Sequence, residues 1–547
     1  MAKLVIFFSF FGGVVPKPPL FDQDYSIKGV IVLPYAEIKE TFTAYYDISH
    51  QRSRVDYYGD LVLTVQRADL AEHANGINYK IAYMVDNEGN PERVCFQTEG
   101  SSEAPVVPQA LLPDISTFAL ISNETKCPSP DYFPRLNGQG CELWKYTVVN
   151  GAKKNEYSFW LQRGPEGEPL PVLYEMMGYD SLLGSHYDQY QLFYHGYQAG
   201  QQEESLFEVS KNYTCRSFPG PGVEHVAIHN PIKEFVHHYE QHLDNDFENF
   251  LIKHGKNYNF SHRELRKTFF RHNYRFIQSM NRKNLHYKLK VNHLADYSPE
   301  EMAMLRGRRV SKGYNGGLPF TEYPWTKVPD NWDWRLLGAV NPVKDQAVCG
   351  SCWSFGTTGT IEGVYFVRTG QLVSLSEQQL IDCSWNEGDN GCDGGEDFRA
   401  YDYIMKVGGI ATEEDYGYYL GQDGKCHDKE VPKTVKLRGF VNVTSGSPRA
   451  LKVALYKNGP VTVGIDASHR SLSFYANGIY YEPKCGNKPD DLDHQVLVVG
   501  YGTLFGQNYW LIKNSWSTYW GNDGYVLISQ KNNNCGVTTQ PTYPLIE

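Results

Sequence analysis

Short apolar runs separated by turn residues dominate the chain from Asp22 to about Cys215. Runs of four or five β-branched and aromatic residues are cut by glycine, asparagine and proline, which is typical of strands. The runs occupy residues 29–33, 42–46, 61–65, 157–161 and 191–194. We therefore predict an antiparallel β-domain over residues 16–217, built as a sandwich or as a curved half-barrel.

This β-domain shows no catalytic constellation, but it is rich in tyrosine. An amphipathic sheet face of this kind could bind a ligand or cover another part of the chain. The alternative is that the tyrosines serve ordinary packing and solubility. The sequence leaves both interpretations open.

The pattern changes after a linker at residues 218–231, which contains Phe218-Pro219-Gly220-Pro221-Gly222. From there to residue 305 the chain is charged and helix-compatible. Five of its residues recur at steps of four, three, four and four, so they share one helical face. They are Arg266, Phe270, Asn273, Ile277 and Asn281. We predict a helical segment over residues 232–305.

A connector rich in glycine and polar residues, 306–328, follows this helical segment. It opens with Arg306-Gly307-Arg308-Arg309. An exposed basic site in a flexible connector is where a processing protease would cut. The alternative is a merely solvated basic loop. Cutting here would release a C-terminal piece that starts between residues 318 and 328.

Length and charge narrow the possible functions. A chain of 547 residues is long enough for two or three domains. Its formal net charge is −11 and its basic residues form no long run, so nucleic acid is not an expected partner. Residues 1–15 combine a lysine with a short apolar run, which is typical of a secretory signal peptide. No later run is long and apolar enough to cross a membrane.

The 11 cysteines divide into four in the N-terminal part and seven in the C-terminal part. An even set beside an odd set indicates structural disulfides and one free thiol, as in a secretory cysteine enzyme. The N-terminal four are Cys95, Cys127, Cys141 and Cys215. Candidate glycosylation sites agree with the secretory route: Asn123, Asn212, Asn259 and Asn442. We expect the protein in the lysosome, a secretory granule or the extracellular space.

One cysteine stands where a helix N-terminus is predicted. Cys352 lies in Gln346-Ala347-Val348-Cys349-Gly350-Ser351-Cys352-Trp353-Ser354, ahead of an apolar, helix-compatible run. Unpaired N–H groups and the helix dipole would favour its thiolate. A thiolate needs a proton partner and an orienting group. His494 opens one strand-like run downstream, and Asn514 follows another.

Together these segments resemble the papain family of cysteine proteases, most closely its cathepsin L-type branch, over residues 329–547. The resemblance implies an α+β fold: a two-lobed papain-like peptidase with a helical inhibitory prodomain and, here, an upstream antiparallel β-domain. By family role, Cys352 attacks the scissile carbonyl, His494 carries the proton and Asn514 orients the imidazole. Gln346 and the Cys352 N–H would form the oxyanion hole, and Trp516 would shield the His494–Asn514 bond.

The resemblance also implies pairings and a substrate cleft. The family's disulfides map onto Cys349–Cys392, Cys383–Cys426 and Cys485–Cys535, which leaves Cys352 free. The positions expected to contact substrate, besides Trp516, are Gly394, Gly395, Glu396, Asp397, Gly464, Gln495 and Gln540.

This chain departs from the family at two places. Glu396 and Asp397 stand where relatives place apolar residues of the main specificity pocket. We expect better tolerance of polar or basic side chains at P2, the second residue before the cleaved bond. The alternative is that both carboxylates point to solvent. Ser517 replaces a usual glycine, and it would be strained if that turn needs φ > 0.

The helical segment resembles cathepsin L-type propeptides. Arg266 to Asn281 match the interspersed motif, with His262 in place of its leading glutamate. Asn292, Leu294 and Asp296 match a second motif, in which Lys290 and Leu294 replace the usual glycine and phenylalanine. The resemblance implies an inhibitory prodomain that lies through the cleft in the reverse direction to substrate. In layout, the chain resembles the two-chain haemocyte cysteine proteinases of insects.

The expected partners are protein and peptide substrates, the chain's own prodomain as inhibitor, and its own cleaved N-terminal domain. No metal or organic cofactor is expected. Two other functions remain open: a binding protein that acts through the β-domain with a silent protease fold, and an acyl- or amide-transferring enzyme. Intact Cys352, His494 and Gln346 favour the protease over the first, and Asn514 with the propeptide-like helix favours it over the second.

Overall fold

The structure is a computed structural model that describes residues 17–21, 23–85, 91–128, 140–217, 230–236, 241–283, 285–322 and 325–547. The chain forms two compact units. One is built mainly from residues before Phe269, and the other mainly from Phe269–Glu547. The predicted signal peptide and nearly all of the predicted linker lie outside the described residues.

The first unit contains one antiparallel sheet of eleven described strands in the order β6-β5-β4-β3-β2-β1-β11-β10-β9-β8-β7. Two meanders, β1 to β6 and β7 to β11, join where β1 pairs with β11. The strands are β1 Tyr25–Leu33, β2 Ile38–Asp47, β3 Arg52–Tyr57, β4 Val62–Arg67, β5 Ile77–Val85, β6 Pro91–Glu99, β7 Ala119–Lys126, β8 Gly140–Asn150, β9 Lys153–Arg163, β10 Pro169–Asp180 and β11 Ser185–Ala199.

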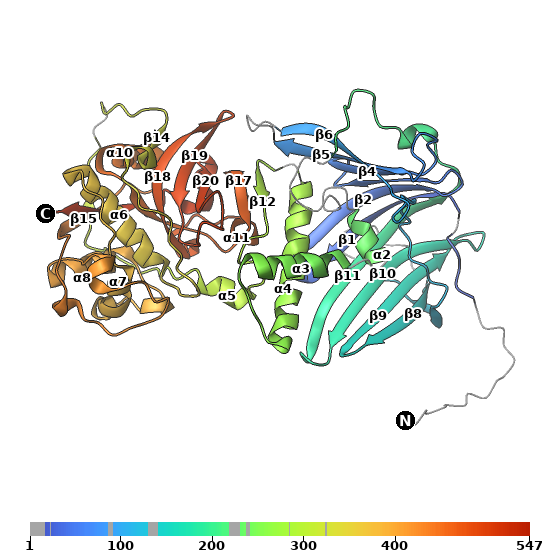
Figure 1. Cartoon of the computed structure of the whole chain (residues 1–547), viewed down its shortest axis with the longest axis horizontal. Helices are drawn as coiled ribbons and strands as arrows, with labels where there is room; N and C mark the ends of the chain where they lie inside the picture. Colours follow the sequence, from blue (N-terminus) through green and yellow to red (C-terminus); the bar gives the residue numbers. More distant parts are fainter. Residues whose placement is uncertain are drawn as a thin grey trace. The chain divides into compact units, whose positions relative to one another are not determined.

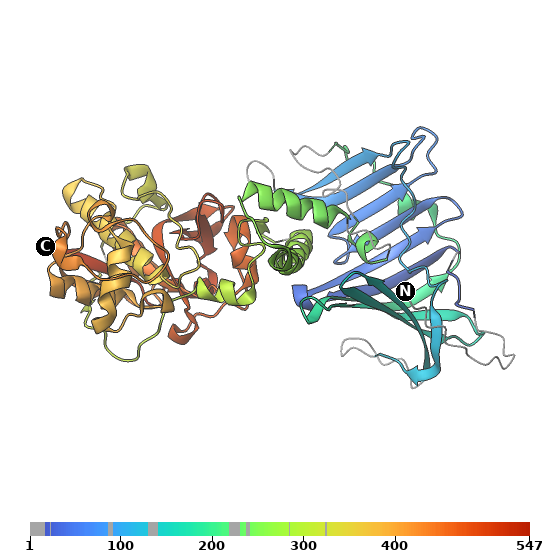
Figure 2. The same cartoon turned by 60° about the horizontal axis from the view of Figure 1, so that its bottom comes forward.

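The predicted antiparallel β-domain is thus confirmed. Because the strands belong to one sheet, which Figure 2 shows strongly bent, the half-barrel interpretation is right and the sandwich is wrong. Alternate side chains point inward, as in β2, where Ile38, Glu40, Phe42 and Ala44 are buried. Many of the tyrosines lie in the core.

A short helix, α2 Pro231–Val236, completes that core. Ile232, Phe235 and Val236 are buried in the same cluster as the sheet's aromatic residues. The Tyr190 hydroxyl donates to the Phe235 carbonyl at 3.1 Å. The helix falls in the segment predicted to be prodomain, yet its apolar residues pack with the β-domain. The first unit also holds α3 Gln241–Lys253 and the start of α4 Phe260–Arg282.

Two disulfides tie the first unit. Cys95 bonds to Cys215, and Cys127 bonds to Cys141. Sequence spacing alone permits three pairings of four cysteines, so this pairing is information that only the structure supplies.

The second unit begins with propeptide-like elements: the rest of α4, β12 Tyr287–Leu289 and α5 Pro299–Met304. The residues of the predicted helical face hold this segment together. Phe270 and Ile277 are buried, and Asn273 donates to the Ala295 carbonyl at 2.9 Å. Asn281 bonds to both backbone groups of Leu289. The face predicted from spacing is therefore the buried, bonding face.

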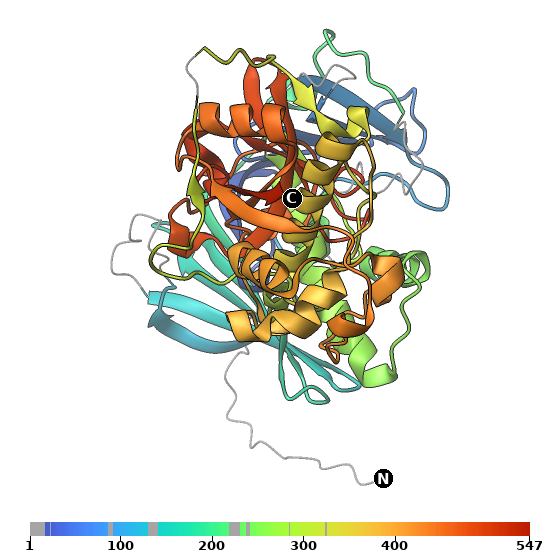
Figure 3. The same cartoon turned by 90° about the vertical axis from the view of Figure 1, so that its left-hand side faces the viewer.

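The rest of the second unit has a helical side and a β-rich side (Figures 1 and 3). Its main helices are α6 Cys352–Thr369, α7 Glu377–Cys383, α8 Asp397–Val407, α9 Glu413–Tyr416, α10 Pro448–Asn458 and α11 Arg470–Ser473. Its strands are β13 Leu318–Pro319, β14 Trp332–Asp333, β15 Leu437–Asn442, β16 Val461–Ile465, β17 Tyr475–Tyr480, β18 His494–Leu504, β19 Gln507–Lys513, β20 Tyr525–Ser529 and β21 Thr542–Ile546.

The two sides meet along α6, which packs against β18 and β21. Figure 3 shows this helix beside the red strands of the sheet. Small residues permit the approach, because a Cβ at Gly359 would lie 2.8 Å from the Leu497 side chain. The end of α6 that carries Cys352 is therefore held next to the start of β18. Among the described residues, no helix has both the length and the apolarity needed to cross a membrane.

Candidate active site

The structure brings the predicted nucleophile, histidine and asparagine together. Cys352 is the first residue of α6, and it is the free cysteine of the described part of the chain. His494 is the first residue of β18, and its Nε2 lies 2.8 Å from Asn514 Oδ1. Gln495, the next residue, donates its backbone N–H to Cys352 Sγ at 3.4 Å. Trp516 packs on the imidazole, with ring centres 4.7 Å apart.

Gln346 lies in the same site with its amide orientation fixed. Its Oε1 accepts from the Ser515 hydroxyl at 2.7 Å, so its Nε2 faces the other way. That nitrogen donates to the Cys349 carbonyl at 2.7 Å and to the Leu305 carbonyl at 3.0 Å. A propeptide carbonyl oxygen thus sits on the donor that we predicted for the oxyanion hole.

The chain from Leu305 onward fills the cleft. Gly307 lies so close to Gly350 that a Cβ would come within 1.8 Å of the Gly350 carbonyl oxygen. The Gly395 N–H donates to the Gly307 carbonyl at 2.9 Å, and the Arg309 N–H donates to the Gly395 carbonyl at 3.0 Å. This bridge between Arg308 and Gly395 is parallel. Gly394, directly before the bridging glycine, has φ = 110°, a conformation that favours glycine.

Burial shifts the pKa values of Cys352 and His494 in opposite directions. It raises the pKa of Cys352 to about 11, against the hydrogen bond from the Gln495 backbone. It lowers the pKa of His494 to about 4, although the Asn514 hydrogen bond opposes this. Both side chains are fully buried, and desolvation disfavours the charged form of each. In this form of the protein, burial therefore favours the neutral thiol of Cys352 and the neutral imidazole of His494.

The two predicted pocket carboxylates are buried rather than solvent-facing. Glu396 accepts from the backbone N–H and hydroxyl of Ser311 and from Arg399. Asp397, at the start of α8, accepts from the Thr542 hydroxyl. The alternative in which both point to solvent does not describe the structure. The side chain of Arg308 is surrounded by the other predicted pocket residues, Gly464, Gln495 and Gln540.

The basic run at the start of the connector lies in the cleft. Arg306 pairs with Asp493, with Nε and Oδ2 2.9 Å apart, and Arg309 donates to the Asp393 carbonyl. The sequence predicted this run to be an exposed cutting site or a solvated basic loop, and it did not indicate Gly307 and Arg308 as cleft residues. A basic run carries no signal that distinguishes a solvated loop from a segment in a pocket.

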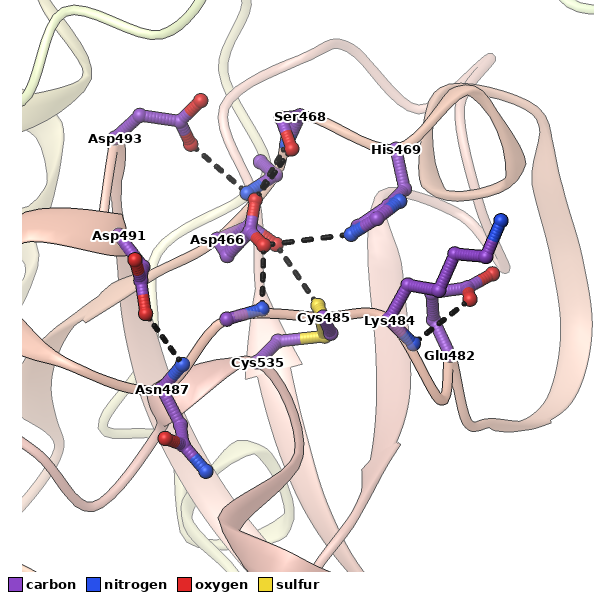
Figure 4. A network of polar contacts seen from close by, with 12 residues as sticks. Asp466, Ser468, His469, Glu482, Lys484, Cys485, Asn487, Asp491, Asp493 and Cys535 are labelled. Atoms are coloured by element: carbon purple, nitrogen blue, oxygen red, sulfur yellow. Dashed lines mark hydrogen bonds and ion pairs between the residues drawn. A yellow bond between two sulfur atoms is a disulfide. The ribbon is translucent and has the colours of Figure 1, made fainter.

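A polar network supports the loop that leads into His494 (Figure 4). Asp466 accepts from the Gly486 N–H at 2.7 Å and from the Ser468 hydroxyl at 2.6 Å, and it pairs with His469 at 3.4 Å. Burial works against it, but these contacts hold the pKa of Asp466 well below its usual range. Asp493 accepts from the Ala467 N–H at 2.8 Å. The network thus anchors the residue directly before His494.

The Cys485–Cys535 disulfide passes through the same network (Figure 4). Because Cys485 is bonded to another sulfur, it offers no thiolate to a metal beside Asp466 and His469. The structure also pairs Cys349 with Cys392 and Cys383 with Cys426.

Ser517 adopts φ = 65°, the left-handed conformation that favours glycine. Of the candidate glycosylation sites, Asn123, Asn212 and Asn259 are exposed. Asn442 is half-buried, and its side chain exchanges hydrogen bonds with Asn315 of the connector.

Two family models match this chain. "Papain family cysteine protease" matches residues 328–545, and "Cathepsin propeptide inhibitor domain" matches residues 247–302. The chain therefore belongs to the papain family of cysteine proteases, and it carries a cathepsin-type propeptide.

Individual proteins of this family are also similar to the chain. Over 307 residues it is 41% identical to digestive cysteine proteinase 2 of Homarus americanus, which covers 55% of this chain and 94% of the relative. It is 40% identical to procathepsin L of Rattus norvegicus over 318 residues, 56% of this chain and 94% of that one. The solved structure of digestive procathepsin L 3 from Tenebrio molitor superposes with a TM-score of 0.51 at 36% identity, covering 55% and 99%. Over its propeptide-like and peptidase segments, the chain is thus similar to digestive cysteine proteinases and to procathepsin L.

Proposed function

We propose that this chain is the zymogen of a cysteine endopeptidase with Cys352 as nucleophile, His494 as proton carrier and Asn514 as the orienting group. The observation that carries the proposal is a single constellation. His494 bonds to Asn514, the neighbouring Gln495 donates its N–H to the free thiol, and Gln346 already donates to a propeptide carbonyl oxygen.

The geometry fits acyl transfer. In the open enzyme, the Cys352 proton passes to His494, and the thiolate attacks the scissile carbonyl carbon. Negative charge builds on the carbonyl oxygen, where Gln346 Nε2 and the Cys352 N–H donate to it, each donor being worth about 3 kcal/mol. His494 then protonates the leaving amine as the C–N bond breaks. Water, deprotonated by His494, hydrolyses the thioester and regenerates the thiol.

Latency follows from how the propeptide lies. Leu305 places its carbonyl on Gln346, and the segment after it runs parallel to Gly395. A substrate that ran antiparallel there would present its carbonyl carbon to Cys352 in the productive direction. The reversed chain instead covers the thiol, keeps it neutral and occupies the donor. Removal of residues 305–311 would restore water and the thiolate–imidazolium pair.

The proposed setting is lysosomal, granular or extracellular protein degradation. Five disulfides in the described residues support an oxidising route. Proteins and peptides are the proposed substrates. The N-terminal β-domain is a candidate partner of the processed enzyme, and exposed Asn123, Asn212 and Asn259 are candidate glycan sites.

The test follows peptide hydrolysis by the recombinant precursor before and after acidification, beside a Cys352→Ala variant. Fluorogenic peptide amides report activity, and gel analysis with N-terminal sequencing reports processing. Activity should appear with cleavage in 306–328 and be absent from the variant. A correctly processed wild-type protein without activity would contradict the proposal and favour a binding protein that acts through its β-domain.

A further inference from the structure

The Arg308 side chain is half-buried in the second unit, and it donates to acceptors from two segments, residues 492–495 and Gln540. Its Nε donates to Gln495 Oε1 at 2.8 Å, one Nη donates to the Leu492 carbonyl at 3.0 Å, and the other donates to Gln540 Oε1 at 2.7 Å. These acceptors surround the planar guanidinium along its fork. Such a set matches the fixed donor geometry of arginine.

The acceptors are held in place by the peptidase itself. The Gln495 amide nitrogen donates to the Thr462 hydroxyl at 2.9 Å, so its oxygen must face the pocket. Thr462 lies on β16 and accepts this bond from β18. Space is reserved as well, because a Cβ at Gly464 would come within 2.6 Å of Arg308 Nε.

The pocket also carries negative charge. Asp397 is buried, and its carboxylate is fixed by Thr542. Burial raises the pKa of Asp397, while Thr542 and the Arg308 guanidinium oppose that rise, so the two groups attract each other. Glu396 is buried next to it and paired with Arg399.

The backbone places Arg308 at a substrate position. Arg308 bridges Gly395, and its neighbours make the two hydrogen bonds with that glycine. An extended substrate pairing with Gly395 in the opposite direction would project its own side chain into the same pocket, because a strand residue keeps its face when its direction is reversed. By the family resemblance, the substrate residue at this position is P2.

We propose that this peptidase selects substrates with arginine at P2, and that Arg308 is the built-in occupant of that pocket in the precursor. The inference rests on the proposed function and adds the substrate class. An apolar P2 side chain would leave these three acceptors without a donor from the substrate, which disfavours its binding. Lysine offers three donors from one atom and cannot reach along the fork.

The test compares three acetylated dipeptide coumarin amides, Arg-Arg, Lys-Arg and Leu-Arg, on the acid-processed enzyme. The ratio of kcat/KM for Arg-Arg over Leu-Arg should exceed about tenfold, with Lys-Arg between them. In Asp397→Asn and Gln540→Leu the ratio should fall toward one. Asp402→Asn removes a charge from an exposed position of the same helix, α8, and should leave the ratio unchanged.

Cleavage of denatured casein separates the two possible failures. Casein cleaved by an enzyme that takes Leu-Arg as well as or better than Arg-Arg would overturn the arginine inference and leave the peptidase standing. Neither casein nor any of the three peptides being cleaved would overturn both. If Asp397→Asn fails to process, Gln540→Leu, which alters a neutral acceptor, decides the question through the same ratio.

Discussion

The propeptide meets the two halves of the cleft in different ways. At the catalytic half it uses its backbone: the Leu305 carbonyl binds Gln346, and Gly307 offers no side chain. At the pocket half it uses a side chain, that of Arg308. The catalytic half must accept any scissile peptide group, so it contacts the bound chain through backbone atoms that every residue has. In the proposed function the pocket half distinguishes substrates, so it contacts the bound chain through the side chain of one residue.

The largest expected effect is at the catalytic half. Gln346→Ala should lower kcat of the processed enzyme about 100-fold with little change in KM, because the lost donor acts mainly in the transition state. Steady-state kinetics on Leu-Arg and Arg-Arg peptides checks this, and both peptides should lose equally. Gln371→Ala, at an exposed loop position, is the matched control. A loss confined to KM would contradict the assignment.

Gly307→Ala should disturb the propeptide more than any other single methyl group in the connector, since its Cβ would lie 1.8 Å from a backbone oxygen. We expect the unprocessed precursor to react with iodoacetamide at Cys352 at least about tenfold faster than wild type, because opening exposes the thiol and lowers its pKa. Mass spectrometry of the labelled peptide measures the rate. The processed enzyme lacks this residue and should be unchanged. Equal labelling rates would show that Gly307 is not what closes the site.

Arg308→Leu tests how the propeptide is held at the pocket half of the cleft. Loss of three hydrogen bonds to acceptors of the peptidase should speed acid activation of the precursor about tenfold. The activity lag after acidification gives the rate. Lys312→Leu, an exposed connector residue, should behave as wild type. An unchanged lag in Arg308→Leu would mean that the backbone contacts alone retain the propeptide.

A lower pH should weaken the preference of the pocket for arginine over leucine at P2. Burial raises the pKa of Asp397, so its carboxylate is protonated at a higher pH than an ordinary aspartate. The attraction for arginine is present above that pKa and is lost as pH falls through it. The kcat/KM ratio of Arg-Arg over Leu-Arg, in which catalytic ionisations cancel, should therefore decline on acidification. In Asp397→Asn the ratio should be low and independent of pH, and a parallel decline there would contradict this origin.

The smallest expected effect is on stability, and it concerns Ser517, which lies outside both halves of the cleft. Ser517 has φ = 65°, so Ser517→Gly should stabilise the processed enzyme by about 1 kcal/mol. Its Tm should rise by about 2 °C, as calorimetry can measure. Ser517→Ala keeps the same backbone cost and should give no rise. Stabilisation by both substitutions would assign the effect to the hydroxyl instead.

Local patterns predicted much of this molecule. The runs at 29–33, 42–46 and 157–161 lie within β1, β2 and β9 because alternation is a property of neighbouring residues. Cys352, His494 and Asn514 were predicted from short segments around each residue and from the family that these segments resemble. Two results depend on distant residues and could not be predicted this way: the pairing of β1 with β11, and the hydrogen bonds of Arg308 to partners 187 and 232 residues away. Charge and glycine content around Arg308 indicate solvent, and only the assembled pocket reverses that indication.

The central pairing of β1 with β11 has a consequence during biosynthesis. β1 ends at Leu33, whereas β11 spans Ser185–Ala199. At typical elongation rates, roughly 10–30 s separate the synthesis of the two strands. During that time one edge of an apolar strand stays without its neighbour, which is a hazard for aggregation. The sheet cannot be completed in the order of synthesis, because β1 lacks its partner until β11 has been made. The exposed edge of β1 in the nascent chain must therefore be protected from aggregation until then.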